Sequence, residues 1–263
     1  MAPTIAHDFR RRLAQKYGLK CVWCGRKIRI KDRKKGNAAT LEHLCPQFFG
    51  GSDEIDNLAL ACRECNSSRF HLHAYVFYVT RLMEGHKPDR EQLQTKLRKL
   101  GLVPEGFELP EGIKQLSPDL SHVYSTSFKN GPSKGRVWKT LTPDERYALR
   151  QHLVNFYGNN CVWCEKKLQS HTSCQKDYAE IDYLQRPTRD DKDKPEKFLL
   201  ICQSCKSISY QLHPYLFLLH QVMCGYSPDR LLIQGKLHEA GLLPYDFEFG
   251  ECLDQFATLT PYA

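Results

Sequence analysis

The spacing of apolar residues along the first half of the chain predicts helices and two short strands. Between Asn66 and Met83, large apolar residues recur at intervals of three and four, which predicts a helix with one face in a core. That face consists of Phe70, Ala74, Phe77, Tyr78 and Leu82.

Shorter segments complete this predicted unit. Residues 8–16 and 89–100 have helical spacing, and Gly101 is a typical helix stop. Residues 40–42 and 58–60 predict two short strands joined by an irregular loop. The order of helix, cysteine turn, two strands and further helices predicts a fold of the α+β class.

The same pattern returns 140 residues later. Cys21-Val22-Trp23-Cys24 recurs at 161–164, and the pair Cys62 and Cys65 recurs at 202 and 205. A constant offset without insertions indicates an internal duplication. We therefore expect a first domain at 1–116, a linker rich in Ser, Gly and Lys at 117–140, and a second domain at 141–263, whose first helix begins after the N-cap Thr142.

Composition limits the class of protein. The 263 residues are 41% hydrophobic and 26% charged, and no apolar run is long enough to cross a bilayer, so we expect a soluble protein without a membrane partner. The first residues show no secretory leader, which favours a cytoplasmic protein. In a reducing compartment, 12 cysteines favour metal binding over disulfides.

Eight of the cysteines have the spacing of zinc ligands. Two CxxC pairs, separated by 37 residues in each copy, allow four thiolates to surround one tetrahedral Zn²⁺. Buried free thiols or a redox pair are the alternatives, which the repetition of the spacing disfavours. We expect two structural zinc sites, one formed by Cys21, Cys24, Cys62 and Cys65, the other by Cys161, Cys164, Cys202 and Cys205.

Polar residues between the first two cysteine pairs carry a family resemblance. Glu42-His43 is followed by Pro46, by a Gly50-Gly51 turn, by Asn57-Leu58 and then by Cys65-Asn66. In this order the segment resembles the HNH endonuclease family. The resemblance implies two tandem ββα-metal domains stapled by zinc, with additional helices. The sequence departs from the family pattern at Glu42, a position where aspartate is commoner.

The same residues suit phosphodiester hydrolysis. Cleavage needs a base for the attacking water and a cation on the phosphate oxygens, and Mg²⁺ or Mn²⁺ prefers oxygen ligands. We expect His43 to be the base, with Glu42 and Asn66 as ligands of one catalytic cation. As the resemblance implies, Asn57 would orient the base. The alternative for Asn66 is a simple helix cap.

Positive charge accumulates near this segment. Residues 1–120 contain 21 lysines and arginines against 14 acidic residues, although a charge run is usually only a solvated face. Beside a phosphodiesterase centre, we expect DNA backbone contacts. The expected contact residues are Arg26, Lys27, Arg29, Lys31, Arg33, Lys34 and Lys35, together with Arg69 one helical turn after Asn66.

The second copy keeps the cysteines and loses the chemistry. The offset pairs Glu42, His43, Pro46, Asn57 and Asn66 of the first copy with Asp182, Tyr183, Arg186, Lys197 and Lys206. We expect a degenerate domain that supports the first copy or grips DNA. With one active site per chain, we expect the protein to nick one strand of DNA. Double-strand cleavage would then require a homodimer.

The sequence therefore predicts a metal-dependent DNA endonuclease of a restriction, phage or mobile-element type. Two alternatives remain open. One is a zinc-dependent nucleic-acid-binding protein without catalysis, and the other is a structure-specific or RNA-directed nuclease.

Overall fold

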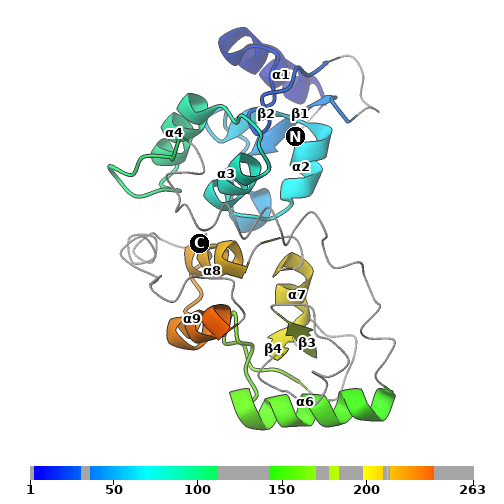
Figure 1. The fold of residues 1–263 in the computed structure, drawn as a ribbon. Coiled ribbons are helices and arrows are strands. Elements are labelled where there is room, and N and C mark those ends of the chain that lie inside the picture. The colour runs from blue at the N-terminus through cyan, green and yellow to red at the C-terminus, as the bar shows by residue number, and fades with distance from the viewer. Residues whose placement is uncertain are drawn as a thin grey trace. The chain divides into compact units, whose positions relative to one another are not determined.

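A computed structural model describes residues 3–30, 36–111, 142–169, 178–183, 198–209, 212 and 214–239 (Figure 1). The described elements divide into two compact units, the first mainly before residue 117 and the second mainly after it. The predicted linker at 117–140 lies outside the described residues.

The first unit is a two-stranded sheet surrounded by helices. Strands β1 and β2 are antiparallel, with Ala39 opposite Cys62 and His43 opposite Leu58, as the predicted strands required. Every residue of β2 is buried. The elements of the unit are α1 (Pro3–Tyr17), β1 (Ala39–His43), the 3-10 turn η1 (Gln47–Phe49), β2 (Leu58–Cys62), α2 (Arg63–Arg69), α3 (Ala74–Met83) and α4 (Arg90–Lys99).

The first cysteine turn is fixed in the core by its own Val22 and Trp23. The backbone N–H of Val22 donates to the carbonyl of Leu60 on β2 at 2.8 Å. Trp23 is fully buried and packs edge-on against Phe77 of α3, with 5.1 Å between ring centroids. The turn is thereby held at the end of β2 where the second cysteine pair begins.

The helix expected over 66–83 is broken in two, which corrects the sequence prediction. Helix α2 ends at Arg69, and α3 begins at Ala74 with the imidazole of His73 accepting from the N–H of Tyr75 as an N-cap. At the break, Phe70 has a left-handed φ of 49° and is 67% exposed instead of buried. The other members of the predicted face lie in the core.

Helix α4 reaches the loop that precedes β2. The buried ammonium of Lys96 donates to the carbonyls of Ile55 and Asp56 at 2.8 and 3.1 Å. This contact holds the residues immediately before Asn57, a predicted site residue. Asp89 accepts from the N–H of Gln92 and caps the helix.

The described elements of the second unit recur 140 residues after those of the first. The predicted N-cap Thr142 is confirmed, and it forms a capping box with Glu145. Trp163 repeats the edge-on contact of Trp23, against Phe217 at 5.0 Å. The elements are α6 (Pro143–Tyr157), β3 (Ala179–Tyr183), β4 (Phe198–Cys202), α7 (Gln203–Ser209), α8 (Pro214–Met223) and α9 (Arg230–Glu239).

The expected α+β class with two cysteine-stapled units is therefore confirmed. Among the described helices, none has the length and apolar content needed to span a membrane.

Removal of the buried indole tests the packing of the first unit. Trp23→Ala is expected to lower the free energy of unfolding by about 3–5 kcal/mol, because it leaves a cavity against Phe77. Urea unfolding of the zinc-loaded chain, followed by far-UV circular dichroism, measures this loss. The control Ile5→Ala removes an exposed side chain and should change stability by less than about 0.5 kcal/mol. Equal effects of both changes would contradict the packing described.

Candidate zinc centres and catalytic site

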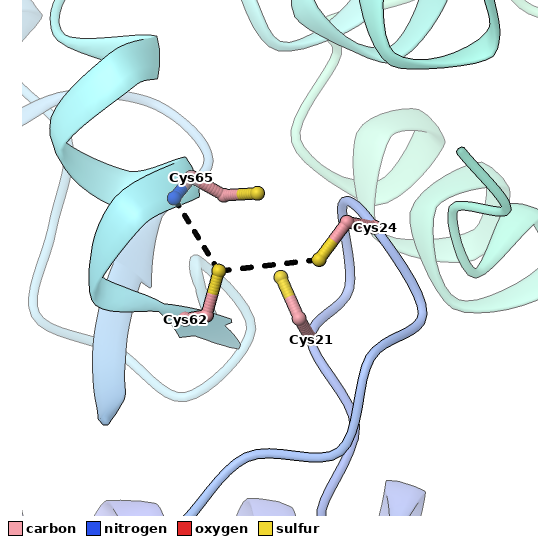
Figure 2. A group of neighbouring side chains, drawn as sticks. All are labelled: Cys21, Cys24, Cys62 and Cys65. Carbon is pink, nitrogen blue, oxygen red and sulfur yellow. Dashed lines mark hydrogen bonds between the residues drawn. The ribbon is translucent and has the colours of Figure 1, made fainter. Parts of the chain in front are cut away.

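The first cysteine tetrad has the geometry of a tetrahedral metal site. Its four sulfur atoms lie within 4.8 Å of one another, and Cys24 Sγ is 3.9 Å from Cys62 Sγ. Tetrahedral zinc with bonds of about 2.3 Å places its sulfur ligands about 3.8 Å apart. Figure 2 shows Cys21 and Cys24 on the turn, facing Cys62 at the end of β2 and Cys65 in α2. The donor set is that of a structural zinc site.

The second tetrad repeats this arrangement. Cys161, Cys164, Cys202 and Cys205 also place their sulfur atoms within 4.8 Å of one another, with 3.8 Å between Cys164 Sγ and Cys202 Sγ. The backbone N–H of Cys205 donates to Cys202 Sγ at 3.3 Å. Both predicted tetrads are thus assembled by the fold.

The electrostatics of the first tetrad call for a cation. Hydrogen bonds from Cys21 and Cys65 lower the pKa of Cys62, whereas Cys21 and Cys62 raise the pKa of Cys65. One thiolate is therefore stabilised by neighbouring thiols, and each further thiolate is repelled. Full ionisation of the tetrad requires a bound metal, which deprotonates its thiol ligands.

Arg26 contacts this centre. Its Nε donates to Cys24 Sγ at 3.2 Å, and its Nη1 lies 2.7 Å from Glu64. The hydrogen bond to Cys24 raises the pKa of Arg26. The guanidinium offsets the negative charge of the thiolates while its side chain stays exposed, and its expected contact with DNA stays a prediction.

His43 ends β1 and is held by an acid that the sequence analysis missed. Its Nε2 lies 2.8 Å from Asp53 Oδ1, which also accepts from Gln47 Nε2 at 2.7 Å. Because a carboxylate only accepts hydrogen bonds, Nε2–H donates in this contact. The hydrogen bond to His43 lowers the pKa of Asp53. An acid two residues after the Gly50-Gly51 turn was the available sequence signal.

Asn57 braces the loop between the strands. Its buried amide accepts from the N–H of Cys45 at 2.7 Å and donates to the carbonyls of Cys45 and Ser52 at 2.9 and 2.8 Å. Close packing here requires glycine, since a Cβ on Gly51 would lie 1.9 Å from the Cys45 carbonyl oxygen. The loop that follows His43 is thereby fixed.

Glu42 is buried against Arg69. Its side chain is 1% exposed, and one carboxylate oxygen accepts from Arg69 Nε. Burial raises the pKa of Glu42, and the Arg69 charge opposes that rise. The other carboxylate oxygen, Oε2, is also buried, and the indole N–H of Trp23 acts on this carboxylate and lowers its pKa.

Arg69 does not lie on a phosphate-facing surface, which corrects an expected DNA contact. The residue is 2% exposed, and its guanidinium donates to Glu42, to the carbonyl of His43 and to that of Leu72. These contacts hold the end of α2 against β1. Arg69 thus positions both residues at the end of β1.

Asn66 joins α2 to β1. Its Nδ2 donates to Thr40 Oγ1 at 3.0 Å and to the Leu41 carbonyl at 2.9 Å, and its amide oxygen takes no part in either bond. It is not the helix cap, because Cys62 occupies that position. Thr40 and Glu42 share one face of β1 by strand alternation, and α2 contacts both.

Two residues here carry the ligand types that a hard divalent cation takes. Glu42 has a carboxylate, buried beside the Trp23 indole, and Asn66 has an amide oxygen. Such an ion keeps several water ligands and needs only one or two protein groups.

The second unit fills the same positions differently. Lys206 replaces Asn66, and its ammonium donates to the Ile181 carbonyl at 3.1 Å and to Glu180 Oε2 at 2.8 Å. These two groups are the counterparts, at the offset of 140, of the groups that Asn66 binds. Tyr183 ends β3 where the first unit has an imidazole.

The buried ion pair is also replaced. Asp182 accepts a hydrogen bond from Ser209 Oγ at 3.3 Å, at the positions of Glu42 and Arg69 in the first unit. Burial raises the pKa of Asp182. An ammonium at the amide position disfavours a divalent cation there.

Few of the expected DNA contacts can be placed. Arg26, Lys27 and Arg29 are exposed, whereas Arg69 is buried as described above. Several residues lie outside the described part of the chain: Lys31, Arg33, Lys34 and Lys35 of the basic run, and Arg186 and Lys197 of the second copy.

Comparison with known proteins finds one similarity, in the first unit. Residues 21–70 match the sequence profile of the family described as HNH endonuclease. This segment contains the first tetrad, both strands and α2. The match indicates a nuclease-type function. No similar curated protein and no similar solved structure is found for the chain.

Metal content tests the tetrads. The intact chain is expected to carry two zinc ions, and Cys62→Ser one, because a Cys₄ site that loses a thiolate loses most of its affinity. Native mass spectrometry counts the ions. Cys45→Ser, outside both tetrads, is the control and should retain two. Two ions in the Cys62 variant would exclude that residue as a ligand.

Proposed function

We propose that the chain is a metal-dependent DNA endonuclease that hydrolyses phosphodiester bonds at a single site in its first unit. The observation that supports this most is the contact of His43 Nε2, at the end of β1, with Asp53. In this proposal the other ring nitrogen, Nδ1, is the base. The nuclease-type family match covers the same residue.

The proposed reaction assigns each side chain one role. His43 takes a proton from the attacking water at Nδ1, while Asp53 holds the opposite side of the ring and stabilises the imidazolium that forms. Asn57 fixes the loop on which this pair rests. Asp53 and Asn57 are therefore positioning residues.

Glu42 and Asn66 would hold the catalytic Mg²⁺ or Mn²⁺. That cation, when bound, supplies positive charge to the phosphate oxygens. Arg69 holds one oxygen of Glu42, and the other, the buried Oε2, is the proposed ligand. Two zinc ions in the tetrads would be structural, since sulfur fills all four positions.

The second unit would be non-catalytic, because Lys206 and Tyr183 stand where the first unit has an amide and an imidazole. One site per chain would nick DNA, and a homodimer would cut both strands. We further propose the domain bounds 1–116 and 141–263, a cytoplasmic location, and a restriction, phage or mobile-element role in a prokaryotic or phage setting.

A second candidate is a zinc-dependent nucleic-acid-binding protein without catalysis. The observation that favours it is the buried Glu42–Arg69 pair, because the guanidinium neutralises the carboxylate that a cation would need. A cleavage assay separates the two candidates.

Loss of the base tests the proposed function. The intact chain should nick supercoiled plasmid with Mg²⁺ or Mn²⁺ and not with EDTA, and His43→Ala should lower the rate by about 100-fold or more. Agarose gels resolve nicked from linear product. His86→Ala, a partly exposed histidine of the same unit, is the control. Zinc-loaded protein that shifts DNA on a gel and cuts none would favour the binding protein.

Removal of the Asp53 carboxylate tests the orientation of the base. Asp53→Ala should lower kcat about 10- to 100-fold and leave the Kd for DNA unchanged, because the imidazole loses the acceptor that fixes its position. Single-turnover cleavage and fluorescence anisotropy measure the two quantities. The control Glu54→Gln removes an exposed acid of the same loop. Similar losses in both variants would point to loop charge in place of a contact with His43.

A further inference from the structure

Four aromatic side chains gather beside the candidate catalytic site. Phe48 and Phe49 come from η1, and Phe70 and His71 from the break after α2. Ring centroids are 5.1 Å apart between Phe48 and Phe49, 5.1 Å between Phe48 and His71, and 3.9 Å between Phe70 and His71. We call these four residues the ring cluster.

The core does not account for the ring cluster. Phe48 is 73% exposed and Phe70 67%, although the aromatic residues of α3 are almost fully buried. The φ of 49° at Phe70 costs about 1–2 kcal/mol for a residue with a Cβ. The fold therefore holds two phenyl rings in solvent, and it holds Phe70 there at an energetic cost. Clustered exposed rings are typical of binding surfaces.

Two residues adjacent in sequence to the ring cluster form hydrogen bonds to His43 or to its partner Asp53. Gln47, next to Phe48, donates to Asp53, which holds the His43 ring. Arg69, next to Phe70, donates to the His43 carbonyl. The two segments that carry the rings are thus tied to His43, and a group bound on these rings would lie near the phosphate on which His43 would act.

The ring cluster is uncharged at neutral pH. Burial lowers the pKa of His71, and the nearby Arg69 charge lowers it further, so its imidazole is neutral. A neutral aromatic surface next to a phosphodiester site matches the nucleobase attached to the adjoining sugar, because bases stack on aromatic rings. In an intact duplex the base faces are already stacked on their neighbours.

We propose that the ring cluster stacks on an unpaired base of single-stranded DNA next to the cleaved phosphate. This inference rests on the proposed nuclease function and gives it a substrate class. Branched or mismatched DNA would be cut where it exposes such a base.

Binding to an inactive enzyme tests the stacking surface. All variants are made in the zinc-loaded, full-length His43→Ala chain, and fluorescence anisotropy gives the Kd for a labelled single-stranded oligodeoxynucleotide and for the matching duplex. Phe48→Ala and Phe70→Ala should each weaken single-strand binding about 5- to 100-fold, the effect of one lost stacked base. The Kd for the duplex should change less than about twofold in this proposal.

Three controls separate stacking from other effects. Phe70→Trp keeps a ring and should retain binding. Phe70→Gly removes the ring and relieves the left-handed strain, so its loss of binding would not come from unfolding. Leu231→Ala removes an 83% exposed apolar residue of the second unit and should have no effect.

Other outcomes would overturn the proposal. Equal losses on duplex and single strand would indicate general DNA contact, and unchanged Kd values with altered self-association on gel filtration would indicate protein docking. These results are independent of catalysis, because His43 is absent throughout. The cleavage assay with the intact chain decides the nuclease function separately.

Discussion

The first unit depends on the place where the cysteine turn meets the junction of β2 and α2. Cys62 is at once the last residue of β2, the N-cap of α2 and a member of the tetrad. Its sulfur accepts from the N–H of Cys65 and lies 3.9 Å from Cys24 Sγ. The start of α2 is therefore set by the tetrad, and with it the face that the helix turns toward β1. A unit with only two short strands needs such a constraint, because its sheet alone is not independently stable.

The consequences extend along α2 to the candidate site. Asn66 contacts β1 one turn after the junction, and Arg69 contacts it one turn later. The buried Glu42–Arg69 pair is costly to desolvate, and several hydrogen bonds to backbone carbonyls offset that cost. In return, the pair fixes the end of β1 and ends the helix. The same contact that orders Glu42 and His43 therefore turns Phe70 outward.

The two units share their scaffold and differ in the polar residues at the positions of the candidate site. Both keep the tetrad, the strand register and a contact from α2 or α7 to the first strand. The contacting groups differ, since Thr40 and Asn66 become Glu180 and Lys206. An ion pair with Glu180 replaces the neutral hydrogen bond to Thr40, whereas the bond to a strand carbonyl is kept. The contact between helix and strand is therefore retained while the polar group at this position changes from an amide to an ammonium.

The sequence by itself determined the elements and the tetrads. Local periodicity predicted β1, β2 and α4, and repeated cysteine spacing predicted which thiols converge, because both signals depend on residues close in the chain or on a strict repeat. Asn57 was also assigned a bracing contact that the structure contains, although its part in catalysis stays a prediction.

Tertiary structure alone decided the partners of Glu42, His43 and Arg26. The spacing of apolar residues over 66–83 is helical throughout. The helix nevertheless ends early, at Arg69, whose side chain contacts Glu42 of β1, 27 residues earlier in the sequence. Asp53 pairs with His43 only because Asn57 folds the intervening loop back on itself. Charged side chains carry no periodic signal of their partners. Their roles emerge only when the fold brings distant segments within hydrogen-bond distance.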